Sequence, residues 1–223
     1  MNRLITILII TVLIASCGEN HALKEETFKF DEENKGWVNI GPARLSFMMR
    51  DSNNISYGFS QVNSDYYFGK SWSSFLGITT HISLTEYNYQ KFISNYGIEF
   101  SLSLTAGFPP FGDALYVEMD DIGFSYDLAY ETISRVNVFS LGKSLIMTDE
   151  GYEADEEIIS AAQVLDNLEV GGTVYQKVLF FRLEDFTEEL YRYSVREIYI
   201  ARDVGLVKYV LNSGLEITRT NNL

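Results

Sequence analysis

Short runs in which apolar and polar residues alternate constrain the fold of this chain more than any other feature. The clearest run places Ile98, Phe100, Leu102 and Leu104 at every second position. A period of two puts these side chains on one face of an extended strand. Similar runs recur along the chain, separated by Gly, Asn, Asp and Ser. We therefore expect a mainly β fold: an antiparallel sheet, built as a sandwich or a curved half-barrel, with at most one or two short helices.

The best local prediction is a β-hairpin over residues 44–59. The stretch 51–54 reads Asp-Ser-Asn-Asn, a turn signal between two alternating runs. Further strands are predicted over 77–89, 98–104, 115–119, 134–141, 173–183, 191–201, 206–211 and 215–220. Pro109 and Pro110 mark either a hinge or a turn between two strands.

Residues 155–168 allow two interpretations. Ile158, Ile159, Ala162 and Leu165 have helical spacing, and the preceding acids would lie at the positive end of a helix dipole. The alternative is a strand over 162–170 that leads into the Gly-Gly turn at 171–172.

The N-terminus has the three parts of a secretory signal in order. Arg3 gives a positive start, residues 4–14 are apolar apart from two threonines, and small residues lead to Cys17. The apolar run is too short to cross about 30 Å of hydrocarbon as a helix.

The stretch Ile14-Ala15-Ser16-Cys17 resembles the lipobox of bacterial lipoproteins. In that family the signal is cut before the Cys, which is acylated and becomes the first residue. The resemblance implies a signal peptide over 1–16, a lipidated tether over 17–26 and a single β-rich domain over 27–223. It also implies attachment to the membrane through Cys17. Gly18 stands where Asp is associated with inner-membrane retention, so we expect a bacterial outer-membrane location.

The C-terminal third carries a second resemblance. The stretch 198–208 reads Ile-Tyr-Ile-Ala-Arg-Asp-Val-Gly-Leu-Val-Lys. It is similar to a pattern of β-rich envelope lipoproteins in which a Y-x-A strand end is followed by G-V-G-L-V-K, and here Asp203 replaces the first Gly. Some of those proteins have a half-barrel related to lipoprotein-carrier folds. This resemblance favours a strand for the second half of 155–168 and brings no catalytic residue with it.

Composition excludes several classes of function. The 31 acids exceed the 17 Lys and Arg residues, giving a net charge of −14, so nucleic acid is not an expected partner. The single Cys excludes an intrachain disulfide and a zinc site built on cysteines.

Candidate chemistry is sparse. His21 falls in the predicted tether, and His81 in an alternating strand reads as an ordinary strand residue. The acids over 149–157 lack the spacing of a calcium loop and read as a solvated loop. Asp120 and Asp121 could supply carboxylates for glycoside hydrolysis, but an acidic chain offers such pairs by chance. We expect no catalytic residue, metal or cofactor.

Aromatic residues are the remaining lead, at 14% of the chain. Most should pack within the sheet, but exposed ones could stack on a sugar or anchor a partner. The candidate binding residues are Tyr66, Tyr67, Trp72, Phe108 and Phe111.

The sequence thus predicts a lipid-anchored envelope protein that acts as a non-enzymatic binding or structural module, with a glycan, a lipid or a protein as partner. An alternative is a lipid or lipoprotein carrier, which would show an apolar groove on a curved sheet. A glycan hydrolase is the third alternative and would show two close carboxylates in a cleft.

Overall fold

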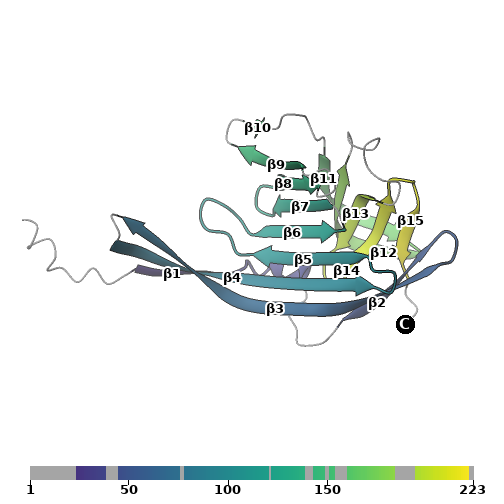
Figure 1. Ribbon diagram of the computed structural model, residues 1–223, viewed down its shortest axis with the longest axis horizontal. Coiled ribbons are helices and arrows are strands. Elements are labelled where there is room, and N and C mark those ends of the chain that lie inside the picture. The colour runs from purple at the N-terminus through teal and green to yellow at the C-terminus, as the bar shows by residue number, and fades with distance from the viewer. Residues whose placement is uncertain are drawn as a thin grey trace, which may run out of the picture. The chain divides into compact units, whose positions relative to one another are not determined.

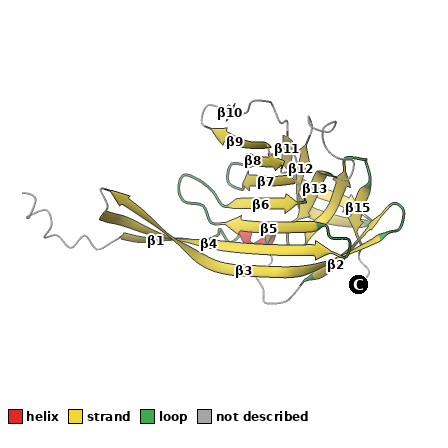
Figure 2. Ribbon diagram, viewed as in Figure 1, coloured by secondary structure: helices red, strands yellow, loops and turns green. Residues whose placement is uncertain are grey.

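The computed structural model describes residues 24–38, 45–75, 78–120, 122–138, 143–148, 151–153, 160–183 and 194–220. Nearly all of its regular structure is strand (Figure 2). The prediction of a mainly β fold is confirmed, and every strand pair whose register is defined is antiparallel. Cys17 and His21 lie outside the described residues, as do Asp121 and most of the acidic stretch 149–157.

The strands form one sheet in the order β10-β9-β8-β7-β6-β5-β4-β3-β2-β15-β14-β13-β12-β11, and β1 pairs with β4 (Figure 1). The elements are β1 (Lys24–Phe28), the 3₁₀ helix η1 (Asn34–Trp37), β2 (Ser46–Asp51), β3 (Ser56–Phe75), β4 (Ile78–Ser94), β5 (Glu99–Thr105), β6 (Ala114–Met119), β7 (Ile122–Asp127), β8 (Thr132–Val138), β9 (Lys143–Thr148), β10 (Gly151–Glu153), β11 (Ser160–Val170), β12 (Thr173–Leu183), β13 (Val195–Ala201), β14 (Gly205–Leu211) and β15 (Glu216–Arg219).

The chain divides into two compact units, one of residues 1–27 with 70–84 and one of 28–69 with 85–223. In the described part of the smaller unit, the Ser71 and Ser83 hydroxyls lie 2.5 Å apart. His81 Nε2 lies 3.6 Å from a Glu26 carboxylate oxygen. β1 begins at Lys24, so the last residues of the predicted tether pair with β4.

The larger unit has a main apolar core and a smaller cluster of buried side chains formed by Val170, Tyr175, Val178, Ala201 and Val207. Its sheet curves until it is nearly closed, so side chains from strands far apart in the sheet order meet inside it. Phe124 of β7 and Phe181 of β12 stack with ring centroids 4.7 Å apart. The side chains that alternate in the sequence fill this core. In β6 every second side chain is buried, and these are Leu115, Val117 and Met119.

The predicted hairpin over 44–59 is confirmed as β2 and β3. The Asp51 carboxylate accepts hydrogen bonds from the backbone N–H groups of Asn53 and Ile55, at 2.9 and 2.8 Å, which closes the turn. The predicted turn at Pro109 and Pro110 joins β5 to β6, with a cis peptide bond between the two prolines.

Of the two interpretations of residues 155–168, the strand is confirmed and the helix is wrong in the described part, since residues 160–170 form β11. The Gly171-Gly172 turn explains the outcome. Both glycines have positive φ, 58° and 79°, the geometry of a two-residue hairpin turn. That turn sets Val170 opposite Thr173 and pairs β11 with β12 along its length. Residues 154–159 lie outside the described residues.

The turn between β13 and β14 places two non-adjacent residues in an unusual backbone conformation. Gly205 has φ of 87° and Asp203 has φ of 64°, both in the left-handed region. Gly occupies that region without strain, and Asp is among the residues that tolerate it best. Asp203 can therefore adopt this conformation at little cost.

Candidate functional site

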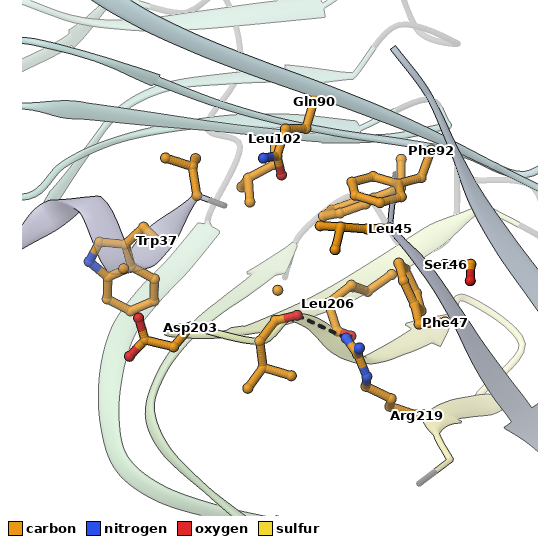
Figure 3. A pocket seen from close by; sticks show the side chains of 15 residues that line it. Trp37, Leu45, Ser46, Phe47, Gln90, Phe92, Leu102, Asp203, Leu206 and Arg219 are labelled. Carbon is orange, nitrogen blue, oxygen red and sulfur yellow. Dashed lines mark hydrogen bonds between the residues drawn. The ribbon is translucent and has the colours of Figure 1, made fainter. Parts of the chain in front are cut away.

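A cavity of about 390 Å³ opens inside the larger unit (Figure 3). Its volume falls within the range of about 300–1,000 Å³ typical of small-molecule sites. The residues around it come from η1, from β2 and the residue before it, from β4, β5, β14 and β15, and from the β13–β14 turn: Gly36, Trp37, Val38, Leu45, Ser46, Phe47, Gln90, Phe92, Phe100, Leu102, Asp203, Val204, Gly205, Leu206 and Arg219.

The walls of this cavity are mainly apolar. Trp37, Phe92 and Leu102 are buried members of the core, yet each has a face on the cavity. In Figure 3, Trp37 faces the cavity from one side, and Leu45 and Phe92 face it from the other. An apolar lining with few polar groups is typical of sites that take an apolar ligand.

The wall that contains η1 is held in place by two buried carboxylates. Asp113 accepts hydrogen bonds from the Asp31 N–H and the Asn34 side-chain amide, both at 2.9 Å, and from the Gly107 N–H at 3.0 Å. Glu86 accepts one from the Phe30 N–H at 2.7 Å. Since a buried carboxylate needs such donors, these bonds hold the segment before Trp37 against the sheet.

η1 also contacts the β13–β14 turn. The Asp203 N–H donates to the Gly36 carbonyl at 2.6 Å. A Cβ atom on Gly36 would lie 2.6 Å from both Arg202 Nε and Asp203 Oδ1. Any larger residue at position 36 would therefore have to displace the Arg202 and Asp203 side chains.

Arg219 brings the positive charge in the cavity wall. It lies two residues after Ile217, which is fully buried, so both side chains lie on the inner face of β15. Its guanidinium carbon lies 4.7 Å from the Phe47 ring centroid. One of its amino groups donates to the carbonyls of Val204 and Leu206, at 2.9 and 3.3 Å. Burial lowers the pKa of this guanidinium from its usual value.

A polar row runs along the inner face of β4. Glu86, Asn88 and Gln90 are all buried and occupy alternate positions, and Gln90 lines the cavity. Asn88 Oδ1 is buried and accepts no hydrogen bond from any described residue. The polar row leads along β4 toward the cavity, whose other walls are mainly apolar.

The loop from Ala106 to Asp113 presents two exposed phenylalanines, the first of the predicted binding residues. Phe108 is 54% exposed and Phe111 57%. The rings lie 5.4 Å apart, edge to face, and Phe28 lies 6.1 Å from Phe108. The Tyr130 hydroxyl donates to the Pro110 carbonyl at 2.8 Å. The loop is thus held in one conformation with its aromatic rings toward solvent.

The other predicted binding residues are also exposed. The Tyr66 hydroxyl donates a hydrogen bond to a Glu86 carboxylate oxygen at 2.5 Å. The Tyr67 ring stacks on the Tyr87 ring, with the ring centroids 5.3 Å apart. Trp72 belongs to the smaller unit. Binding by all five candidates stays a prediction.

The carrier alternative expected an apolar groove on a curved sheet, but the residues that line the cavity were not predicted. Only one signal for Arg219 existed in the sequence: the alternation of the last strand, 215–220, places residue 219 on the same face as Ile217. Among the described residues, no group of three or more His, Cys, Asp or Glu side chains is placed to hold a metal ion.

The chain was compared with protein-family models, with curated proteins and with solved structures, and none of the three comparisons found a match. No helix in the described ranges has the length and apolarity needed to cross a membrane.

Proposed function

We propose that this chain is a lipid-anchored cell-envelope protein that binds an apolar ligand without enzymatic activity. The cavity carries the proposal, because its walls are mostly buried aromatic and aliphatic side chains on the inner face of a curved sheet. This is the mark expected of the carrier alternative. The lipobox-like stretch ending at Cys17 supports attachment to the membrane.

Burial of an alkyl chain in such a cavity is favourable by about 0.8 kcal/mol for each CH₂ group removed from water. The two buried carboxylates that hold η1 keep one wall in place before the ligand arrives. A preformed wall lowers the ordering cost of binding.

The test is binding of dodecanol to the mature chain, measured by isothermal titration calorimetry. Leu45 faces the cavity and is only partly buried, so Leu45→Trp should fill the space without disrupting the core (Figure 3). Ile55→Trp is the matched control, since Ile55 is exposed in the β2–β3 turn. We expect binding by the wild-type chain and by Ile55→Trp, and at least tenfold weaker binding by Leu45→Trp. Equal binding by all three would contradict the proposal.

A second function is favoured by the exposed loop of Phe108 and Phe111, which would rest on the phospholipid surface to which Cys17 is anchored. Phe28 packs on Phe108 and follows Cys17 by eleven residues, a chain length that reaches at most about 40 Å. Aromatic rings favour the membrane–water interface. Since the chain is acidic and anionic lipids would repel it, the phospholipid surface should be zwitterionic.

Sedimentation of the unanchored mature chain with phosphatidylcholine vesicles tests this second function. Replacement of Phe108 and Phe111 by Ser should remove any bound fraction. Tyr96→Ser is the control, because Tyr96 is an equally exposed ring elsewhere on the same unit. If the variant with Ser at both positions sediments with the vesicles as the wild-type chain does, the second function is wrong.

A further inference from the structure

Arg219 has N–H donors for which the described residues provide no acceptor. Guanidinium carries five N–H groups, and the backbone carbonyls of Val204 and Leu206 accept from only one of its nitrogens. No carboxylate of the described residues forms an ion pair with Arg219. The unused donors are not enclosed by protein atoms, and the side chain lines the cavity.

The two acids that share a groove with Arg219, Asp51 and Glu216, interact with other groups. Asp51 accepts from two backbone N–H groups of its turn and from the Tyr57 hydroxyl. Glu216 pairs with Lys208 at 2.9 Å. Arg50 and these two acids line an open groove that Arg219 also borders, so Arg219 lies between that groove and the cavity.

Asp203, which lines the cavity itself, lies away from Arg219. Its backbone and side chain lie against Gly36, next to η1. In Figure 3, Asp203 lies below Trp37, whereas Arg219 lies beside Phe47 at the other end of the cavity. One end of the cavity is therefore cationic, and the walls beyond it are mostly apolar.

A partly buried cation without a counter-ion is unfavourable, and an anion with good hydrogen-bond geometry relieves this cost. The planar guanidinium fork matches a carboxylate or a phosphate. The net charge of −14 repels anions at a distance, but salt screens charges beyond about 8 Å at physiological ionic strength. At contact, the charge of Arg219 therefore decides the interaction.

We propose that the ligand of this cavity is an amphiphile with one anionic group at the end of an apolar chain, such as a fatty acid. Its head pairs with Arg219, and its chain lies against Leu206, Phe92 and Leu102. This inference rests on the proposed function, which requires only that the cavity takes an apolar chain.

The experiment compares three probes of equal chain length: dodecanoate, dodecyl phosphate and dodecanol. Their dissociation constants for the mature chain are measured by calorimetry at neutral pH. Since a hydrogen bond to a charged group is stronger than a neutral one, we expect at least one anionic probe to bind tenfold to a hundredfold tighter than dodecanol. Tighter binding of dodecanoate would indicate a fatty acid, and tighter binding of dodecyl phosphate would indicate a phosphate head.

Arg219→Gln should remove this preference, and a far-UV circular dichroism spectrum that matches the wild type shows that the variant is folded. Arg219→Lys should retain part of the preference, because lysine keeps the charge but not the fork. Arg50→Gln, which changes an exposed arginine on β2, is the matched control and should behave as wild type.

The outcomes separate the two claims. If dodecanol binds as tightly as both anions to the wild-type chain, the inference is wrong and the proposed function stands. If no probe binds, both are wrong. If Arg219→Gln binds dodecanol but keeps the anion preference, the head is recognised elsewhere and the assignment to Arg219 is wrong.

Discussion

The Arg219 guanidinium carbon lies 4.7 Å from the centre of the Phe47 ring. These side chains belong to β15 and β2, which are neighbours in the sheet although the residues are far apart in the chain. The contact holds the cation at the cavity wall, because a guanidinium stacks favourably on an aromatic face. It leaves edge donors of Arg219 directed away from the ring and available to an anion.

The buried carboxylate of Asp113 gives a prediction about stability. Asp113→Ala leaves three N–H donors without their acceptor, so the free energy of unfolding should fall by about 3 kcal/mol. Urea unfolding measures this loss. Asp166→Ala removes an exposed carboxylate paired with Lys177 and should leave the free energy of unfolding nearly unchanged. Similar values for the two variants would show that Asp113 does not hold η1.

The stack of Phe124 on Phe181 gives a prediction about the core. Both rings are fully buried, so Phe181→Ala should lower the free energy of unfolding by about 3–5 kcal/mol through lost burial and the cavity left behind. Val174→Ala on the same strand changes an exposed side chain and is the control. A loss below about 1 kcal/mol for Phe181→Ala would contradict the closed curvature of the sheet.

Tyr126 gives a prediction about alkaline pH. Burial, together with the carboxylates of Glu131 and Asp127, raises the pKa of Tyr126 to about 12. The unfolded chain releases this proton near pH 10, so the contribution of Tyr126 is complete below pH 10 and is lost as the pH rises toward 12. The free energy of unfolding should fall by about 3 kcal/mol through this loss. In Tyr126→Phe, stability should therefore fall less steeply between pH 10 and 12, as urea unfolding at each pH would show; identical slopes would contradict the burial of the hydroxyl.

The lipid anchor gives a prediction that does not depend on the cavity. Cys17→Ser should abolish labelling of the protein by a radioactive fatty acid and leave the uncleaved precursor, since the lipobox-like stretch then lacks its acceptor thiol. Normal labelling of the variant would show that Cys17 is not the site.

The strands were largely predictable because local residues decide them. The hairpin of β2 and β3 follows from alternating runs around a turn whose Asp51 closes it with its own side chain. β7 was missed although Ile122, Phe124 and Tyr126 alternate, because the acids just before it read as candidate chemistry. β11 shows the limit of periodicity: its spacing fits a helix, and the Gly171-Gly172 turn overrides that spacing.

The residues that line the cavity could not be predicted, because their proximity is a property of the folded sheet. Its walls join segments as distant as Trp37 and Leu206, and no local pattern in the sequence marks them as neighbours. The segment that carries Trp37 is held by the carboxylates of Glu86 and Asp113, which lie far from it in the sequence. The exposure of Phe108 and Phe111 was easier to predict, since a loop with two prolines cannot bury both rings in a sheet.

Native mass spectrometry of the mature chain from Gly18 onward, exported without its anchor and purified without detergent, tests the central claim most directly. This chain contains every residue of the described fold. We predict a species that carries the added mass of one amphiphile, which organic solvent releases and which is absent from Leu45→Trp. A wild-type chain found only in its unliganded mass, or the same added mass on Leu45→Trp, would contradict the account.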